Sequence, residues 1–397
     1  MLSNRINQLS ESETLAMSRK CRELKAIGKN VINLSLGEPD FNTPDYIKNA
    51  AKKAIDENFT FYSPVAGYAD LREAICKKLK RDNNLDYTCD QIVVSTGAKQ
   101  SIANVVLSLV NPGEEVILPA PYWVSYKEIV KVAEGKAVFI PTKIEQEFKV
   151  TPAQIEAAIT PKTKLIIFSS PCNPTGSVYT KEELKRIAEL LGKYPAVYII
   201  ADEIYEHINF IGKHESIAQF DSIKEHVILV NGVSKGFAMT GWRIGYIAAT
   251  KKIAQACDKL QGQFTSGASS IAQKAAQEAI GSDPDTAELR TMKKAFLERR
   301  DLMLKLLGEI PGLKLNHPDG AFYIFPDVSS YFGKSDGTNT VTNASDLCMF
   351  FLNTVYVATV PGDAFGDPNC IRFSYATSKE NLIEAVKRIK NVLETLK

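Results

Sequence analysis

Short apolar runs alternate with amphipathic stretches through the middle of this chain, from about residue 90 to residue 250. The runs are rich in β-branched residues, as buried strands are, and cover residues 92–94, 116–118, 137–140, 165–168, 197–200, 227–230 and 244–248. Helical patterns lie between them, and two begin with clear start signals, Thr151 before Pro152 and Thr180 with Glu183. The alternation predicts an α/β fold with a mainly parallel, doubly wound sheet covered by helices on both faces.

The chain changes character after about residue 250. Long helical patterns cover roughly residues 250–280 and 284–308, and a last helix is expected at about 378–396. Short strands are expected between these helices, at residues 321–325, 355–359 and 371–374. A chain of 397 residues is too long for one hydrophobic core. We therefore expect a second, smaller α+β domain.

Four residues with possible chemical roles each follow a strand candidate: Gly97, Asn173, Asp202 and Lys235. In doubly wound sheets, ligands bind beyond the carboxyl ends of the strands. The four residues are therefore expected to meet at one site, although they are far apart in the sequence.

Lys235 lies in the sequence Asn-Gly-Val-Ser-Lys-Gly-Phe at residues 231–237, directly after Ser234 and eight residues before Arg243. An amine, a hydroxyl and a guanidinium suit a cofactor that carries both an aldehyde and a phosphate, and pyridoxal phosphate (PLP) has both. A serine–lysine pair by itself is more often part of a solvated loop. The assignment therefore depends on the other site candidates.

Asp202 ends a buried strand candidate, where an acid needs a partner. A pyridinium nitrogen is one such partner, and a helix N-cap or a buried ion pair are the alternatives. Tyr205 follows three residues later and could reach the ring hydroxyl of the cofactor. Asn173 lies between two prolines and shortly before Gly176, so its backbone is restricted and its amide could donate to the same oxygen; an ordinary Asx turn is the alternative.

Gly97 and Ala98 form a glycine-containing turn between a strand candidate and a helical pattern. Such a turn directs free backbone N–H groups at an anion, and together with Ser234 and Arg243 it would bind a phosphate. Trp123 is an aromatic residue of the kind that stacks on a pyridine ring, although plain core packing would explain it equally well.

These motifs together resemble those of the class I, fold-type I, PLP-dependent aminotransferases, and most closely the bacterial aspartate aminotransferases. The resemblance runs from Leu-Ser-Leu-Gly-Glu-Pro-Asp-Phe at residues 34–41 to Ile-Arg-Phe-Ser-Tyr at residues 371–375, which is almost the whole chain. It implies a large PLP-binding domain over residues 46–280. It also implies a small, substrate-closing domain made of residues 1–45 together with residues 281–397.

The resemblance assigns catalysis to Lys235 as the Schiff-base lysine, with Asp202 on the pyridine nitrogen and Tyr205 on the ring oxygen. The residues implied in cofactor binding are Gly97, Ala98, Lys99, Trp123, Asn173, Asp202, Tyr205, Ser234, Lys235 and Arg243, joined by Tyr62. The residues implied in substrate binding are Thr14, Gly37, Lys99, Trp123, Asn173 and Arg372. Arg372 resembles the arginine that binds the substrate α-carboxylate through two parallel hydrogen bonds.

Tyr62 resembles a tyrosine that reaches the phosphate in the neighbouring subunit, which implies a homodimer. Lys99 and Thr14 match a pair that, in one subgroup of aspartate aminotransferases, engages the distal carboxylate of the substrate. For Lys99, a solvated lysine at a helix start is the alternative. A cation at this place favours aspartate and glutamate over neutral side chains.

The expected reaction is a ping-pong transfer of the amino group of L-aspartate to 2-oxoglutarate. Aromatic, prephenate or other class I aminotransferases remain alternatives, because the subgroup includes enzymes that act on prephenate, and a PLP-dependent β-lyase is a further one. A net charge of +2 and mixed charges give no reason to expect nucleic acid or membrane as a partner. Seven scattered cysteines without a Cys-x-x-Cys motif favour free thiols, no metal site and a cytoplasmic protein.

Overall fold

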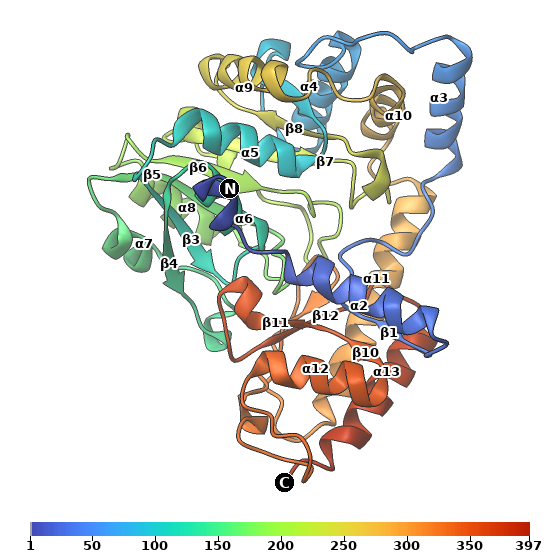
Figure 1. The fold of residues 1–397 in the computed structure, drawn as a ribbon. Helices are drawn as coiled ribbons and strands as arrows, with labels where there is room; N and C mark the ends of the chain where they lie inside the picture. Colours follow the sequence, from blue (N-terminus) through green and yellow to red (C-terminus); the bar gives the residue numbers. More distant parts are fainter. Residues whose placement is uncertain (1) are drawn as a thin grey trace.

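A seven-stranded sheet forms the centre of the larger part of the molecule, in a computed structural model that describes residues 2–397 (Figure 1). Its strands are β2 (Ile92–Ser95), β3 (Glu115–Ala120), β4 (Lys136–Pro141), β5 (Thr163–Ser169), β6 (Tyr198–Asp202), β7 (Val227–Gly232) and β8 (Gly245–Ala248). Their spatial order is β2-β8-β7-β6-β5-β3-β4. Strand β8 runs antiparallel to both of its neighbours and the other pairs are parallel, so the predicted mainly parallel sheet is confirmed.

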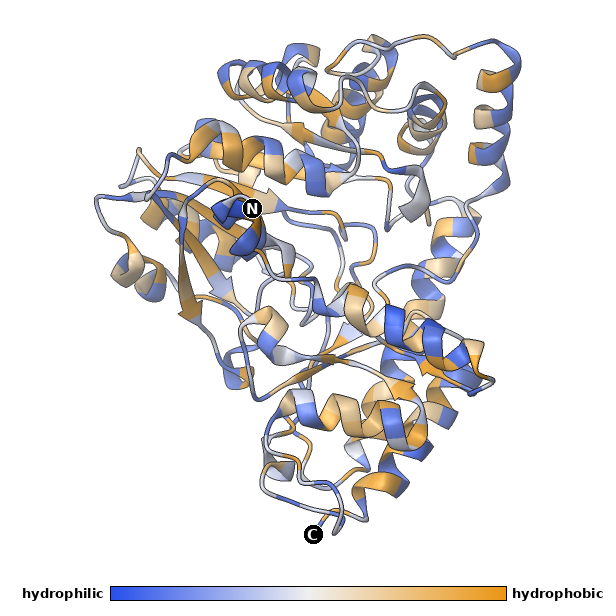
Figure 2. Cartoon of the chain, viewed as in Figure 1, coloured by the Kyte–Doolittle hydropathy of each residue, from blue (hydrophilic) through white to orange (hydrophobic). Residues whose placement is uncertain are grey.

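Both faces of this sheet are buried. Alternate residues of β7 show this, since Ile228 and Val230 pack into one apolar cluster while Val227 and Leu229 pack into another. The first cluster includes α5 (Ala98–Leu109), α6 (Ser125–Val132) and α9 (Lys251–Phe264); the second includes α4 (Ala69–Asn83), α8 (Lys181–Leu191) and α10 (Ser270–Gly281). Figure 2 shows the apolar colour along the strands between these helices. Helices on both faces make the sheet doubly wound, as predicted.

The remaining helices complete the two parts of the molecule (Figure 1). In the larger part, α3 (Asp45–Asp56) packs against α10, and α7 (Pro152–Ala158) against α8. In the smaller part lie α2 (Glu13–Ala26), α11 (Ala287–Gly308), α12 (Ala344–Val355) and α13 (Lys379–Leu393). The short helix α1 (Asn4–Asn7) lies near the start of the chain.

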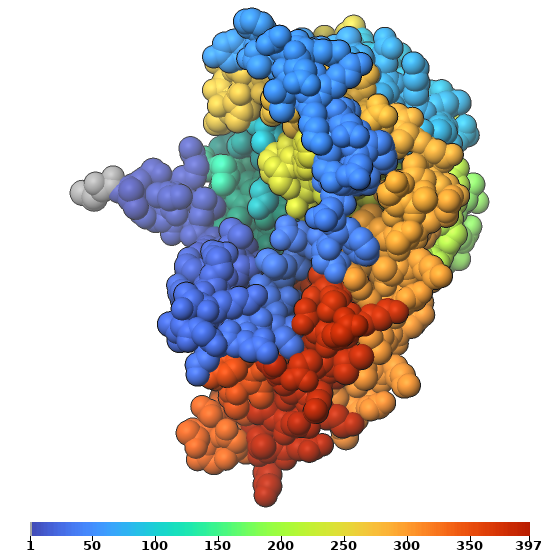
Figure 3. Space-filling model, turned by 90° about the vertical axis from the view of Figure 1, so that its right-hand side faces the viewer, coloured from blue at the N-terminus to red at the C-terminus, as the bar shows by residue number. Residues whose placement is uncertain are grey.

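The strands of the smaller part are short. A three-stranded antiparallel sheet has the order β11 (Val360–Pro361), β12 (Ile371–Ser374) and β9 (Tyr323–Ile324). Strand β1 (Ile32–Asn33) pairs in parallel with β10 (Val357–Ala358), which brings the N-terminal segment beside the C-terminal part of the chain. Figure 3 shows these blue and red segments in contact. The exact limits of the two domains, at residues 45 and 280, stay a prediction.

Helix starts follow the sequence signals, but one predicted helix is interrupted. Thr180 and Glu183 form the expected capping box of α8, and Thr151 caps α7. The helical pattern over residues 250–280 is two helices, α9 and α10, because residues 265–269 read Thr-Ser-Gly-Ala-Ser and have low helix propensity. Ser266 takes a left-handed conformation at φ 59° and Ser269 starts α10 as its N-cap.

Of the strands predicted in the smaller part, the one over residues 371–374 is confirmed as β12, whereas the other two are shorter than expected, and β9 is only Tyr323–Ile324. The strand predicted over residues 355–359 is only Val357–Ala358, since α12 continues to Val355. Within residues 2–397, no helix combines the length and the apolar character that a membrane span needs.

Candidate active site

A cavity of about 250 Å³ lies where several strands of the large sheet end. Most predicted site residues line it: Thr14, Gly37, Ala98, Lys99, Trp123, Asn173, Asp202, Tyr205, Ser234, Lys235, Arg243 and Arg372. Gly97 lies directly against the guanidinium of Arg243 at its edge. Tyr62 is not among the lining residues and is 98% exposed.

Lys235 is held on the loop that follows β7. Its Nζ donates to the carbonyl of Gly37 and lies 5.7 Å from the centroid of the Tyr205 ring. Removal of water from around this amine lowers the pKa of Lys235 to about 8, although the charge of Glu38 opposes the change. Gly236, the next residue, has no room for a side chain because a Cβ there would lie 2.5 Å from the His207 ring. The loop is therefore fixed by close packing behind the lysine.

Asp202 ends β6 with its side chain buried at 5% exposure. One carboxylate oxygen accepts a hydrogen bond from the Tyr126 hydroxyl at 2.6 Å, and the other accepts from the backbone N–H of Ile204 at 3.2 Å. Burial raises the pKa of Asp202 to about 6. A buried carboxylate with two neutral donors is a strong acceptor for a cationic nitrogen in the cavity.

Tyr126 is a site residue that the sequence did not predict. It lies on α6, three residues after Trp123, and its hydroxyl meets Asp202 across 76 residues of sequence. Its ring packs edge-on against Trp123 with ring centroids 5.4 Å apart. Its position about one helical turn after Trp123 could have indicated a residue near the cofactor. The contact with Asp202 could not be predicted, because it depends on how α6 packs.

Arg372 and Asn173 are joined in the wall of the cavity. Arg372 lies on β12 at 2% exposure, and its Nη1 donates to Asn173 Oδ1 at 2.9 Å. Its Nη2 donates to the carbonyl of Ser35 at 2.6 Å, while Nε has no partner among the described residues. The amide oxygen of Asn173 is thus occupied, so its NH₂ group remains to donate to a ligand.

The other end of the cavity suits an anion. Helix α5 starts at Ala98, after Gly97 at φ 82°, and the first N–H groups of a helix have no partner within it. Arg243 is fixed beside this turn by a 2.8 Å hydrogen bond from Nη1 to the carbonyl of Thr240. A side chain at Gly97 would collide with that guanidinium. Ser234 lines the same cavity and adds a hydroxyl.

Lys99 and Thr14 reach this cavity from different elements. Lys99 is in the first turn of α5, and its Nζ lies 5.0 Å from the centroid of the Trp123 ring. Partial removal of water, together with the nearby charge of Arg243, lowers the pKa of Lys99. Thr14 is in the first turn of α2, which belongs to the smaller part of the molecule. A cation and a hydroxyl at one cavity can bind an anionic side chain.

These groups fit the predicted cofactor, PLP. The partly desolvated amine of Lys235 can bond to an aldehyde, and the helix start with Arg243 can hold a phosphate. The buried carboxylate of Asp202 can hold a pyridinium nitrogen. Among residues 2–397, the Nε of Arg372 has no hydrogen-bond partner, so this guanidinium can still donate to a carboxylate ligand.

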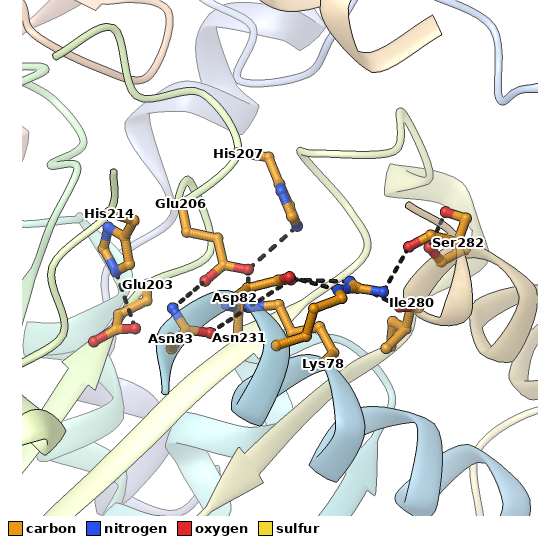
Figure 4. A network of polar contacts seen from close by, with 12 residues as sticks. Lys78, Asp82, Asn83, Glu203, Glu206, His207, His214, Asn231, Ile280 and Ser282 are labelled. Carbon is orange, nitrogen blue, oxygen red and sulfur yellow. Dashed lines mark hydrogen bonds and ion pairs between the residues drawn. The ribbon is translucent and has the colours of Figure 1, made fainter. Parts of the chain in front are cut away.

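A buried polar network lies next to this site (Figure 4). Lys78 of α4 contacts the carboxylate of Glu206 and donates to Asn83 Oδ1 at 2.8 Å. Asn83 in turn donates to Glu206 at 3.3 Å, and the Nε2 of His207 lies 3.2 Å from the same carboxylate. Burial alone would raise the pKa of Glu206, but Lys78 and the two nearby histidines lower it to about 2.

The network also brings possible metal ligands together. Ligand atoms of Glu203, Glu206 and His214 lie within 4.8 Å of one another. The ammonium of Lys78 already balances Glu206, and His214 Nε2 lies 3.0 Å from Glu203. Burial would lower the pKa of His214, but the two glutamates raise it. Glu206 and Glu203 thus each already have a partner within the network, Lys78 and His214 respectively.

The chain matches the family model described as aminotransferase class I and II over residues 29–389. It is 50% identical over 399 residues to a Petunia hybrida protein named bifunctional aspartate aminotransferase and glutamate/aspartate-prephenate aminotransferase, covering 100% of this chain and 83% of that protein. It is 46% identical to the aspartate/prephenate aminotransferase of Nitrosomonas europaea, and the match covers 99% of each chain.

Solved structures agree with these matches. The aspartate aminotransferase of Rhizobium meliloti superposes with a TM-score of 0.96 at 39% identity, over 100% of both chains. The aspartate aminotransferase of Thermus thermophilus, solved with maleate, superposes with a TM-score of 0.93 at 39% identity, over 99% of both chains.

Proposed function

The chain belongs to the class I and II aminotransferase family, and on this premise we propose that it transfers the amino group of L-aspartate to 2-oxoglutarate. It is a PLP-dependent enzyme whose substrates are amino acids and 2-oxo acids. One observation carries the proposed specificity. A single cavity is lined by the amine of Lys235, the carboxylate of Asp202 and two separate cations for a substrate, Arg372 and Lys99.

When bound, PLP supplies an aldehyde that condenses with amines and a ring that accepts the electrons of a broken Cα–H bond. In the proposal, Gly97, Ala98, Ser234 and Arg243 hold its phosphate, and Asp202 holds its pyridine nitrogen. Tyr205 and Asn173 donate to its ring oxygen, while Trp123 lies against its ring. Tyr126 supports Asp202 through the 2.6 Å hydrogen bond.

Lys235 has two roles in the proposed reaction, as covalent anchor of the cofactor and as the base at the substrate Cα. A base must be neutral before it takes a proton, and an ordinary lysine is almost fully charged at neutral pH. Burial lowers the pKa of Lys235 to about 8, so a useful fraction of the amine is neutral near pH 8. Lys235 Nζ then accepts the Cα proton and later returns it.

The substrate is proposed to be oriented by its two carboxylates. Arg372 binds the α-carboxylate with donors that its two protein hydrogen bonds leave free. Gly37 closes over this carboxylate, and Lys99 with Thr14 binds the distal one. A neutral side chain would leave Lys99 partly desolvated and unpaired, which disfavours it. The same contacts serve both halves of a ping-pong reaction, because aspartate and 2-oxoglutarate both carry two carboxylates.

An absorbance experiment tests the proposal. The purified protein with PLP should be yellow, lose this absorbance when aspartate is added, and regain it with 2-oxoglutarate. Lys235→Ala should abolish the response, and borohydride reduction should fix the cofactor to Lys235 in the wild type alone. The proposal is wrong if aspartate leaves the spectrum unchanged, or if a neutral amino acid reacts faster than aspartate.

Prephenate is a second candidate acceptor, favoured by the names of the relatives from Petunia hybrida and Nitrosomonas europaea. Prephenate carries two carboxylates, so Arg372 and Lys99 could bind it in the same way. After bleaching with aspartate, prephenate should restore the absorbance at a rate comparable with that of 2-oxoglutarate. A rate below a hundredth of that would leave 2-oxoglutarate as the acceptor.

We further propose a homodimer in which Tyr62 reaches the phosphate of the other subunit. Supporting this, Phe61 and Tyr62 are 80% and 98% exposed, and Phe264, the last residue of α9, is 66% exposed. Large exposed aromatic side chains are typical of interfaces. We also propose the domain limits: a large domain over residues 46–280 and a small one made of residues 1–45 with 281–397. A cytoplasmic location is proposed as well, and the seven free cysteines support it.

A further inference from the structure

Tyr323 places a buried hydroxyl between the two parts of the molecule. It lies on β9, opposite Ser374 in the register with β12, the strand that carries Arg372. Its side chain is fully buried, and its hydroxyl lies 2.7 Å from the hydroxyl of Tyr205, which follows β6 of the large sheet. One hydrogen bond therefore links the small sheet to a residue proposed to bind the cofactor.

The same tyrosine touches two other proposed site residues. A Cβ on Gly37 would lie 2.6 Å from the Tyr323 hydroxyl, so the absence of a side chain at Gly37 leaves room for this group. The guanidinium of Arg372 lies 4.5 Å from the centroid of the Tyr323 ring, within the range of a cation–π contact. Tyr323 is thus packed against the proposed carboxylate binder and the loop that closes over it.

The direction of the hydrogen bond between Tyr205 and Tyr323 follows from the number of protons that each hydroxyl can donate. A tyrosine hydroxyl has one proton to donate and two lone pairs to accept. If Tyr205 donates its proton to the ring oxygen of the cofactor, its 2.7 Å contact with Tyr323 can only be one in which Tyr323 donates. The order of donation is then Tyr323 to Tyr205 to the ring oxygen.

We propose that Tyr323 is a positioning residue that donates to Tyr205 and thereby strengthens the hydrogen bond from Tyr205 to the cofactor ring oxygen. This inference rests on the proposed function, and specifically on the role given there to Tyr205. A hydroxyl that accepts a hydrogen bond becomes a better donor, because the bonds of a chain polarise one another. Since β9 and β12 belong to the same small sheet, that sheet carries both Arg372 and the hydroxyl that starts this hydrogen-bond chain.

Tyr323→Phe tests the inference because it removes the hydroxyl and keeps the ring beside Arg372. A stabilised anionic ring oxygen makes it easier for the lysine–cofactor linkage to lose its proton. Without the support of Tyr323, the pKa of that linkage, read from visible absorbance as a function of pH, should rise by about half a unit. The kcat for aspartate should fall about threefold to tenfold, while KM should change less than about twofold, since the Arg372 contact is retained.

Tyr375→Phe is the matched control. Tyr375 is also fully buried in the smaller part, but its hydroxyl donates to the carbonyl of Ala321 at 3.4 Å and has no other hydrogen-bond partner among the described residues. The control should keep the spectral pKa and the kcat of the wild type. If Tyr375→Phe shifts both as much as Tyr323→Phe does, the effect is one of general packing and the inference is wrong.

A double-mutant cycle with Tyr205→Phe tests whether Tyr323 donates its hydrogen bond to Tyr205. If Tyr323 acts through Tyr205, adding Tyr323→Phe to Tyr205→Phe should produce no further shift in the spectral pKa. An additive shift, or an unchanged pKa in Tyr323→Phe alone, would overturn the inference. Neither result touches the proposed function, which instead fails if the wild-type protein shows no spectral response to aspartate.

Discussion

Arg372 donates two of its N–H groups to Asn173 and Ser35, and its buried Nε has no partner in the part of the chain that the structure describes. An arginine has five such donors in a planar fork, so the remaining ones match a carboxylate. At the residue scale, the contacts of these side chains with the protein fix their positions and still leave hydrogen-bond donors free for a ligand. Asn173 is a second example, because its amide oxygen accepts from Arg372 while its NH₂ group has no partner within residues 2–397.

Arg372→Lys should lower kcat/KM for aspartate by about tenfold to a hundredfold, because a lysine keeps the charge but loses the two parallel hydrogen bonds. Steady-state kinetics measure this. Arg388→Lys is the control, since Arg388 is paired with Glu384 at 2.8 Å on α13, away from the cavity, and should leave kcat/KM unchanged. An Arg372→Lys enzyme with wild-type KM for aspartate would contradict the role given to Arg372.

Lys235 should give the apoprotein a characteristic pH dependence. Burial lowers the pKa of Lys235 to about 8, and only its neutral amine can attack the cofactor aldehyde. The rate at which added PLP becomes attached should therefore rise with pH and level off above about pH 8. At pH 7 it should be about a tenth of the plateau, because one pKa unit below the midpoint leaves about a tenth of the amine neutral. Stopped-flow absorbance between pH 6 and pH 10 measures this; a rate that still rises about tenfold between pH 8 and pH 9 would show an ordinary lysine.

At the scale of elements, the network of Figure 4 ties α4 to the segment that follows β6. Lys78 and Glu206 are almost fully buried, at 3% and 4% exposure of their side chains. Two charges are removed from water here, and each is stabilised mainly by the other; Asp82 lies 3.9 Å from Lys78, and His207 and His214 lie near Glu206. The segment after β6 carries Tyr205, and His207 packs against Gly236 beside Lys235, so this pair supports the back of the site.

Lys78→Met should lower the free energy of unfolding by about 3–5 kcal/mol, because it leaves the buried Glu206 carboxylate without its ammonium partner. Lys80→Met is the control on the same helix. Lys80 pairs with Asp86 at 2.8 Å on the surface, and its loss should cost less than about 1 kcal/mol. Urea denaturation compares the two, and equal costs would show that burial does not decide the strength of the Lys78 pair.

The pH dependence of stability provides a further test of this pair. Glu206 has a pKa of about 2 in the folded protein, against an ordinary value of 4.5. A lowered carboxylate pKa contributes stability that is complete above about pH 4.5 and is lost as the pH falls towards 2. Glu206→Gln should therefore be less stable than the wild type at neutral pH, and the difference should shrink between pH 4.5 and pH 2. A constant difference across this range would contradict the assignment.

At the scale of the whole molecule, residues far apart in sequence form one cavity: Thr14 and Gly37 come from the N-terminal segment, and Arg372 from β12. Parallel pairing of β1 with β10 joins these two ends of the chain. The smaller part therefore supplies proposed substrate contacts, while the large sheet supplies proposed cofactor contacts. Tyr62, at 98% exposure, is not among the described residues that line the cavity on this chain.

A complementation experiment tests whether Tyr62 acts between subunits. Each variant alone should be inactive at limiting PLP. Tyr62→Ala loses a phosphate contact, and Lys235→Ala loses the base. In a mixed dimer, the Tyr62→Ala chain keeps its own lysine and receives the tyrosine of the partner subunit. Mixing should thus restore about a quarter of the wild-type activity if subunits exchange at random. No restoration, together with a monomer in sedimentation, would show that Tyr62 does not act between subunits.

The sequence by itself determined the strand-and-helix alternation, the doubly wound sheet and the residues that follow each strand. These depend on local patterns, since β-branched runs, capping boxes and glycine turns act over a few residues. The rule that ligands bind beyond strand ends then brought Gly97, Asn173, Asp202 and Lys235 together before any contact was known. The substrate arginine was recognisable only by resemblance, because an arginine on a strand has no distinctive local pattern.

Only the tertiary structure decided which side chains meet across elements. The Tyr126–Asp202 and Tyr205–Tyr323 hydrogen bonds join residues 76 and 118 positions apart, and no periodicity encodes such pairs. The antiparallel direction of β8 and the break between α9 and α10 were also decided by packing and by the short polar segment between the helices. A pattern along the chain reports which face of an element is buried, whereas the partner of a buried hydroxyl depends on where another element places its own.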